Sequence, residues 1–197
     1  MRLDNLTEQS SVYTCNVYLI RGDWNSLQDQ NTLVDVGRDP SIFEELENIS
    51  TGLGKKKVDQ VVLTHTHSDH AGLIQEVRRR LEPQVLAFSE FCEGIDRVLQ
   101  NGDTLKLGDQ LFEVIHAPGH SSDSICLFCA SNGVLFSGDT QLSFLNPQGN
   151  HHEDFIKALK YLASLEVKSV WPGHGPPLQK NASAMIRSSA RMLGGDD

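Results

Sequence analysis

Apolar residues along the chain recur in short runs that are typical of buried β-strands. Several of these runs are rich in β-branched residues and are bounded by Gly, Asn, Asp or Pro, which predicts strands separated by turns. Asn132-Gly133 is a strong signal for a tight hairpin between two of them. The predicted strands cover residues 12–20, 31–36, 58–63, 84–88, 111–116, 125–130, 134–136 and 167–171.

Helical spacing of apolar residues appears between these strands. It predicts helices over residues 40–49, over 73–81, around Phe155 to Leu162, and over roughly 178–193. Strands with short connections dominate both halves, and helices are interspersed among them. The simplest architecture is an α/β (α+β) fold in which two β-sheets pack together with helices on the outside. We expect a single domain over residues 1–197.

Composition places the chain among ordinary globular proteins. Of the 197 residues, 39% are hydrophobic and 22% are charged, which is enough for one sizeable core. The net charge of −9 disfavours a broad nucleic-acid surface, which is normally basic. No stretch approaches the roughly 18 apolar residues of a membrane helix, and the start lacks the apolar core of a signal peptide. We therefore expect a soluble, cytoplasmic protein that does not associate with membranes, of undetermined oligomeric state.

Three histidines and one aspartate lie within six residues, directly after the apolar run 58–63. They are His65, His67, Asp69 and His70. Buried polar groups need partners, and a metal ion is the partner that suits this set. Nitrogen and oxygen ligands of this kind fit zinc, iron or manganese better than calcium or magnesium. The run therefore predicts a metal site.

Three later loops have the same character. Each follows an apolar strand and places glycine beside a side chain that can bind metal: residues 117–120 with His120, 137–140 with Asp139, and 172–175 with His174. Glycine lets the backbone turn sharply there and brings the ligand to the rim of the sheets. We expect these three side chains to join the first cluster.

The four motifs, in this order and spacing, resemble those of the metallo-β-lactamase fold superfamily over roughly residues 12–193, and most of all its glyoxalase II-like hydrolase branch. The resemblance implies a four-layer αβ/βα sandwich of two mixed sheets with the site at one edge. It also implies two metal positions joined by a bridging carboxylate. The ligands of the first are His65, His67 and His120, those of the second are Asp69, His70 and His174, and the bridge is Asp139.

The function implied is that of a dinuclear metal-dependent hydrolase acting on a small ester, thioester or lactone. A metal can lower the pKa of bound water from about 15.7 to about 7, which supplies a hydroxide nucleophile at neutral pH. Asp69 is the predicted catalytic acid–base, since it can orient the hydroxide and carry a proton to the leaving group. The predicted cofactors are two divalent metal ions per chain, zinc first, with iron or manganese as alternatives. The substrate-binding residues carry no readable signature, and we expect specificity in the loop 141–150.

The sequence differs from several related families at positions that matter for their activity, and these differences narrow the range of expected functions. The main zinc β-lactamases would have cysteine at Asp139, and flavodiiron oxygen reductases would have glutamate at His67, so we do not expect either activity. Full-length glyoxalase II enzymes carry a glutathione-binding helical region after the last ligand, whereas about twenty residues follow Gly175 here, so we do not expect a hydroxyacylglutathione substrate. The segment 173–191 resembles lactamase-like endoribonucleases, so a phosphodiesterase acting on single-stranded nucleic acid is an alternative, although a disfavoured one. A second alternative is a persulfide dioxygenase with a single iron, and a third is a binding protein without catalytic activity.

Other residues received narrower interpretations. Cys126 and Cys129 form a C-x-x-C within a predicted strand, where positions three apart face opposite sides, so we expect two core residues and no metal ligand. Basic residues of the last helix, Arg187 among them, are interpreted first as a solvated face. The neighbours of the predicted ligands are expected to fix the imidazole tautomers. They are Thr64, Thr66, Ser68, Asp123 and Thr140.

Overall fold

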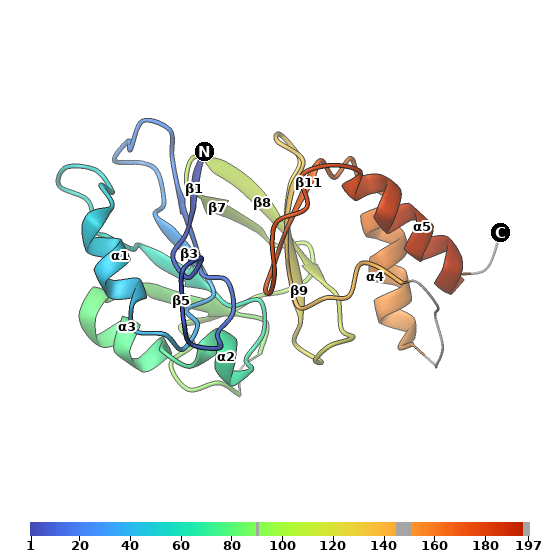
Figure 1. Cartoon of the computed structure of the whole chain (residues 1–197), viewed down its shortest axis with the longest axis horizontal. Helices are drawn as coiled ribbons and strands as arrows, with labels where there is room; N and C mark the ends of the chain where they lie inside the picture. The colour runs from blue at the N-terminus through green and yellow to red at the C-terminus, as the bar shows by residue number, and fades with distance from the viewer. Residues whose placement is uncertain (90, 145–150, 195–197) are drawn as a thin grey trace.

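The computed structural model describes residues 1–89, 91–144 and 151–194 and contains two mixed β-sheets that pack face to face (Figure 1). Three helices cover the outer face of one sheet, and two helices cover the outer face of the other. The order of layers is therefore helix, sheet, sheet, helix. The predicted fold class, a four-layer αβ/βα sandwich, is confirmed.

The first sheet has six strands in the order β1 to β6, and its first three strands are antiparallel while the rest run parallel. Its strands are β1 (Arg2–Asn5), β2 (Tyr18–Arg21), β3 (Thr32–Val34), β4 (Gln60–Val62), β5 (Gln84–Ala87) and β6 (Arg97–Val98). The helices on its outer face are α1 (Ile42–Asn48), α2 (Ser68–Ala71) and α3 (Ile74–Leu81).

The second sheet has five strands in the order β11-β10-β9-β8-β7, antiparallel except for the parallel pair β10 and β11. Its strands are β7 (Thr104–Leu107), β8 (Gln110–His116), β9 (Ile125–Cys129), β10 (Val134–Gly138) and β11 (Ser169–Pro172). Helices α4 (Glu153–Ser164) and α5 (Ala182–Gly194) cover it. The predicted hairpin is confirmed, because Gly133 has a φ of +70° and Cys129 pairs with Val134.

Alternation along the strands divides the core into layers. In β2, Leu19 packs toward the helices of the first sheet, whereas Tyr18 and Ile20 pack between the two sheets. Phe112 and Phe136 of the second sheet meet them there and are fully buried. Burying each such side chain contributes roughly 1.5–3 kcal/mol, so the apolar face shared by the sheets stabilises their association.

The two cysteines of the C-x-x-C are confirmed as core residues on opposite faces of β9. Cys126 packs under the outer helices, and Cys129 packs between the sheets.

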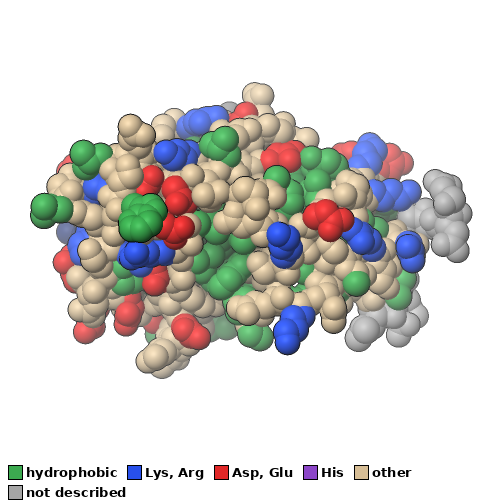
Figure 2. All heavy atoms as spheres, turned by 90° about the horizontal axis from the view of Figure 1, so that it is seen from above, with side chains coloured by type: hydrophobic (Ala, Val, Ile, Leu, Met, Phe, Trp, Pro, Cys, Tyr) green, Lys and Arg blue, Asp and Glu red, His purple; other side chains and the backbone are tan. Residues whose placement is uncertain are grey.

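Among the residues that the structure describes, no helix has the length and apolar character needed to cross a membrane. Figure 2 views the molecule from the side on which the N-terminus lies, and no histidine is visible on that face.

Several predicted boundaries are wrong. The strand predicted over 12–20 covers only Tyr18–Arg21, because residues before it bond to distant loops: the amides of Cys15 and Asn16 donate to the carbonyls of Asp69 and Gly173. The last helix begins at Ala182, since the residues before it turn back and Leu178 pairs with Val170 of β11. Strands β1, β6 and β7 and the short helix α2 were not predicted from the sequence.

Candidate metal centre

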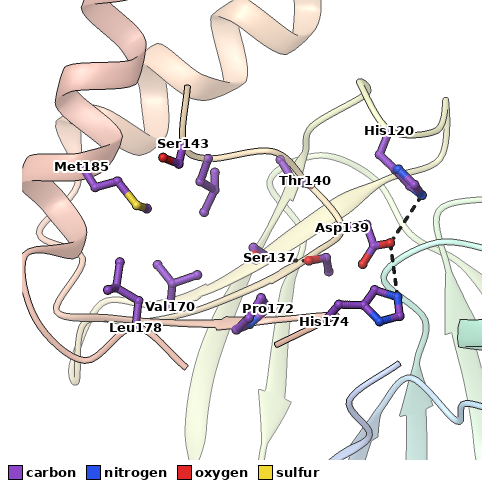
Figure 3. Close-up of a pocket in the computed structure, with 12 residues that line it drawn as sticks. His120, Ser137, Asp139, Thr140, Ser143, Val170, Pro172, His174, Leu178 and Met185 are labelled. Carbon is purple, nitrogen blue, oxygen red and sulfur yellow. Dashed lines mark hydrogen bonds and ion pairs between the residues drawn. The ribbon is translucent and has the colours of Figure 1, made fainter. Parts of the chain in front are cut away.

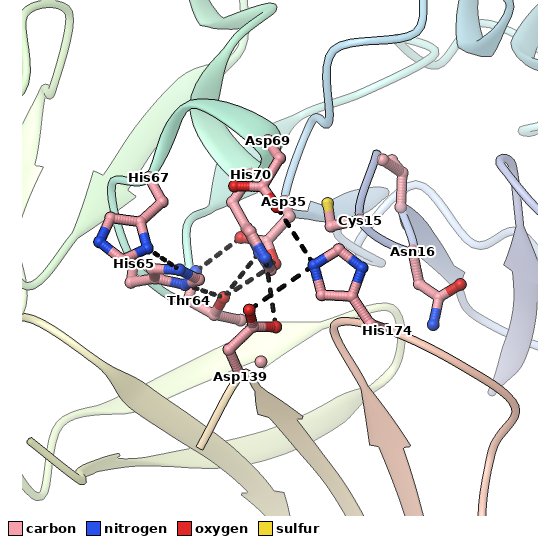
Figure 4. Close-up of polar contacts among 12 residues, drawn as sticks. Cys15, Asn16, Asp35, Thr64, His65, His67, Asp69, His70, Asp139 and His174 are labelled. Carbon is pink, nitrogen blue, oxygen red and sulfur yellow. Dashed lines mark hydrogen bonds and ion pairs between the residues drawn. The ribbon is translucent and has the colours of Figure 1, made fainter. Parts of the chain in front are cut away.

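Loops that follow four strands meet at one edge of the two sheets (Figure 4). The segment between β4 and α3 carries the first group of predicted ligands. Three loops from the second sheet bring the others, after β8, β10 and β11. All seven predicted ligands therefore lie together, although they are spread over 110 positions of the chain from His65 to His174.

The first cluster consists of three imidazole nitrogens that face one point. His67 Nδ1 lies 3.1 Å from His65 Nε2 and 2.9 Å from His120 Nε2. Around a tetrahedral metal ion with bonds of about 2.0–2.1 Å, neighbouring ligand nitrogens lie about 3.3–3.4 Å apart. The three nitrogens are thus close to the spacing that a shared ion requires.

The second cluster has two histidines and one aspartate. His174 Nε2 lies 3.2 Å from Asp69 Oδ2, and one ligand atom of His70 lies within 4.8 Å of both. Asp139 lies between the clusters. Its Oδ2 is 3.5 Å from His120 Nε2 and 3.6 Å from His174 Nε2 (Figures 3 and 4), and its Oδ1 is 3.3 Å from His70 Nε2. Its carboxylate therefore stands where a bridge between two ions would stand.

Two atoms at the centre of this group are buried and unsatisfied. Neither His70 Nε2 nor Asp139 Oδ1 makes a hydrogen bond to any residue that the structure describes. They lie 3.3 Å apart, close enough for charge attraction but without hydrogen-bond geometry. An unsatisfied buried polar atom costs about 1–3 kcal/mol, more if it is charged. A divalent cation would satisfy both atoms, so the donor set fits metal ions of the kind that nitrogen and oxygen ligands prefer.

Asp35, which was predicted only as the end of a strand, orients His70. Its Oδ2 lies 2.8 Å from His70 Nδ1 and accepts a hydrogen bond from the Thr64 hydroxyl at 2.8 Å, while its Oδ1 accepts one from the Thr64 backbone nitrogen at 2.7 Å. The contact places the proton on Nδ1 and leaves Nε2 free to face the cluster. Asp35 is buried and has a φ of 61°, which is uncommon outside glycine. An aspartate inside the apolar run 33–36 was the available signal.

The electrostatics of the centre favour a positive charge on His70. Burial alone would lower the pKa of His70, but the carboxylates of Asp35 and Asp139 outweigh it and raise that pKa. Burial, followed by the charge of His70, lowers the pKa of His65 to about 4, so His65 is neutral at pH 7. Burial would raise the pKa of Asp139, but the contact with His70 outweighs it and lowers the pKa to about 2. Carboxylates that hold a proton on His70 would also hold a metal ion at its Nε2.

Asp123 connects two of the loops that form the first cluster. Thr66 donates to its Oδ2 from the backbone nitrogen at 3.0 Å and from the hydroxyl at 2.7 Å, and Ser121 donates to its Oδ1 at 2.6 Å. Of the neighbours of the predicted ligands, Thr64, Thr66 and Asp123 therefore make hydrogen bonds that support the ligand loops. Ser68 begins α2, and the Thr140 hydroxyl is buried without a hydrogen bond to a described residue.

The segment before β2 holds the loop of His174, which sequence reasoning did not foresee. The ring of Tyr13 stacks on that of His174, with centroids 5.5 Å apart and an angle of 15°. Asn16 donates from Nδ2 to the carbonyls of Pro172 and Gly175, at 2.9 Å each. Gly173 must be glycine, because a Cβ there would lie 2.3 Å from Asp139 Oδ1.

Two hollows open beside the clusters. One has a volume of about 490 Å³ and extends from His120, Asp139 and His174 toward α5 (Figure 3). The other has a volume of about 540 Å³ and extends toward the start of α4. Both are lined by His120 and Asp139, so the two hollows meet at the candidate metal centre.

Comparison with known proteins assigns this geometry to a family. The family model described as the metallo-beta-lactamase superfamily matches residues 11–174. The chain is 28% identical over 150 residues to the atrochrysone carboxyl ACP thioesterase dmxR1 of Cryptosporiopsis sp., covering 74% of this chain and 46% of the relative. It is 31% identical over 129 residues to a hydroxyacylglutathione hydrolase of Chromohalobacter salexigens, covering 64% of this chain and 48% of that enzyme. The chain thus spans about half the length of these curated relatives.

Solved structures agree on the fold. The crystal structure of ETHE1 from Myxococcus xanthus superimposes with a TM-score of 0.74 at 23% identity, and the match covers 100% of this chain and 86% of that one. Identity at this level shows a shared fold. The activity has to be argued from the candidate metal centre and its surroundings.

Proposed function

The chain belongs to the metallo-beta-lactamase superfamily, and from this membership we propose that it is a metal-dependent hydrolase of a small ester, thioester or lactone. A thioester is the first choice, because a relative that covers most of this chain is named a thioesterase. The observation that carries the proposal is the convergence of three imidazole nitrogens on one side of Asp139 and a second ligand set on the other.

The proposed centre holds two divalent ions, with zinc as the first candidate and iron or manganese as alternatives. One ion would lie among His65, His67 and His120, the other among Asp69, His70 and His174, with Asp139 between them. Bound there, such ions would polarise a carbonyl oxygen and make a water molecule nucleophilic at neutral pH.

The protein's own groups would position that water and move its proton. The Asp69 side chain is only 17% exposed, and its Oδ2 lies 3.2 Å from His174 Nε2. We assign Asp69 the acid–base role: Oδ2 accepts a proton from the attacking water and delivers it to the leaving sulfur or oxygen. Asp35 keeps His70 in the tautomer that presents Nε2, and Asp123 keeps the loops of His67 and His120 in register.

The residues in and around the candidate metal centre argue against two alternatives, a dioxygenase with one iron and a nuclease. A dioxygenase with one iron would need only one ligand set, whereas Asp69, His70 and His174 form a complete second set. Arg187, one of the basic residues considered for binding nucleic acid, pairs with Glu166 at 2.8 Å and donates to the carbonyl of Ala163. That contact supports the interpretation of Arg187 as part of a packed, solvated helix face.

The test combines metal analysis with a substrate screen. The purified protein is expected to hold two metal ions per chain and to hydrolyse thioesters in preference to lactones and phosphodiesters. His67→Ala and Asp139→Ala should each lower kcat/KM at least 100-fold, and Asp139→Ala should lose the second ion. His116→Ala is the matched control, because His116 bonds to the carbonyl of Ser122 and lies outside the clusters. One iron with oxygen consumption, or full turnover in Asp139→Ala, would overturn the proposal.

A further inference from the structure

The hollow of about 490 Å³ beside the candidate metal centre changes character along its length. At one end it is lined by His120, Asp139 and His174. At the other end it is lined by aliphatic and thioether side chains, and Figure 3 shows Met185 reaching into it from α5. The apolar lining residues are Leu142, Val170, Pro172, Leu178 and Met185.

The apolar end is built into the core between the second sheet and its helices. Leu142 and Val170 belong to the buried cluster under α4 and α5, and Leu178 and Met185 pack against that cluster while remaining partly exposed. Apart from the candidate ligands, none of the described residues that line the hollow carries a charge. Among the described residues, a ligand at this end would therefore meet small hydroxyls and apolar groups, which favours a hydrocarbon chain.

The second hollow is more polar than the first. It is lined by Gln141, His151 and His152 together with Phe155, and it shares His120 and Asp139 with the first. A substrate whose reacting carbonyl lies at Asp139 would extend one way into an apolar space and the other way into a more polar one. A thioester has this division when a hydrocarbon acyl chain is joined to a polar thiol.

We propose that the apolar hollow binds the acyl chain of the substrate, so that the protein is selective for thioesters with medium-length hydrocarbon acyl groups. The inference rests on the proposed hydrolase function and names its substrate class. In the reaction a C–O bond forms from water and the C–S bond breaks. One proton of the water passes to the sulfur of the released thiol, and the other is lost as the acid ionises to a carboxylate.

The proposal predicts a dependence on chain length. Acetyl, butyryl, hexanoyl, octanoyl and dodecanoyl thioesters of one thiol, N-acetylcysteamine, would be compared with the metal-loaded protein. Each buried CH₂ contributes about 0.8 kcal/mol, so kcat/KM should rise about two- to fourfold per CH₂ and then level off when the hollow is full.

Met185→Gln replaces the thioether with a polar side chain of similar length and should lower the octanoyl-to-acetyl ratio of kcat/KM about tenfold. Met192→Gln is the matched control, because Met192 lies on the same helix, is 48% exposed and does not line the hollow. Its ratio should equal that of the unaltered protein. A flat chain-length profile in an active enzyme, or an unchanged ratio in Met185→Gln, would overturn the assignment of the hollow.

Binding of the product separates this inference from the proposed function. Octanoate should bind at least tenfold more tightly than acetate by calorimetry, and Met185→Gln should remove that difference. If no thioester is hydrolysed but octanoate binding depends on Met185, the hydrolase function fails and the acyl site stands. If octanoate binds no more tightly than acetate, or binds equally well to Met185→Gln, the acyl site is wrong whatever the activity.

Discussion

Replacement of Asp35 by asparagine tests whether this buried carboxylate controls the metal-binding form of His70. In the native protein Oδ1 accepts the backbone N–H of Thr64, while Oδ2 faces the Thr64 hydroxyl and His70 Nδ1. In Asp35→Asn the amide oxygen keeps the bond from the Thr64 N–H, so the NH₂ group turns toward His70. Nδ1 must then accept, and the proton moves to Nε2, the atom that faces Asp139.

The expected effect is a loss of metal affinity without a loss of ligands. Outer partners of metal-binding histidines typically contribute 10- to 100-fold in affinity or activity, which is about 1.4–2.7 kcal/mol. We expect a loss in this range for Asp35→Asn, measured by competition with a chromogenic chelator, together with a comparable fall in kcat/KM. Thermal unfolding of the metal-free form would show whether the variant still folds.

Asp39→Asn is the matched control. Asp39 is also buried and follows the same strand, but its carboxylate contacts Ser10 and Ser41 and no imidazole. Its metal affinity should stay within about twofold of the unaltered protein. Unchanged affinity in Asp35→Asn would refute the tautomer argument, and equal losses in the two variants would point to general destabilisation instead.

Three further perturbations probe the centre and the core. Gly173→Ala places a Cβ 2.3 Å from Asp139 Oδ1 and 2.7 Å from His70 Cε1; metal content after dialysis should fall at least tenfold, and a native content would contradict the crowding argument. Phe136→Ala opens a cavity between the sheets, where Phe136 is fully buried, and should lower the free energy of unfolding in urea by about 3–5 kcal/mol; a loss below about 1 kcal/mol would show that the sheets can close the gap. The pKa of Asp139 is lowered to about 2, so its contribution to the stability of the metal-free protein is present above the ordinary aspartate pKa of about 3.9 and is lost as pH falls toward 2. Metal-free Asp139→Asn should therefore lose less stability than the unaltered protein between pH 4 and pH 2 in acid-unfolding curves, and parallel curves would speak against the shift.

The strands with strong apolar runs were predictable because both of their faces are buried. All residues of β9 are buried and apolar, so a continuous apolar run marks that strand clearly, and β4 is also buried throughout, with Val61 and Val62 following Gln60. Strands β1 and β6 were not predictable: β1 is a partly exposed edge strand and β6 has only two exposed residues. Strand β7 was not predicted because it is a short segment between two turns that contain glycine, and those turns were the clearest features of the local sequence. The prediction of a single domain stays a prediction.

The candidate site was predictable where its residues form local motifs. Four residues that can bind metal lie within six positions of the chain: His65, His67, Asp69 and His70. Each of the later loops has a glycine next to a side chain that can bind metal. The contacts that Asp35, Tyr13 and Asn16 make with the site depend on how distant segments meet, at separations of 35 residues for Asp35 and 156 for Asn16. A pattern read along the chain carries no information about such pairs. The role of the seven residues as metal ligands remains a prediction that the metal analysis tests.

The origin of the ligands has a consequence for how the protein holds together. One group comes from the segment that follows β4 in the first sheet, and the other comes from loops of the second sheet. Any ion bound among them would link the first sheet to the second sheet, in addition to the apolar layer that joins the two sheets. An ion present at 1,000 times its Kd would stabilise the folded state by about 4 kcal/mol. Chelation should then do more than stop turnover: it should let the two sheets part at this edge, where amide hydrogen exchange would rise first.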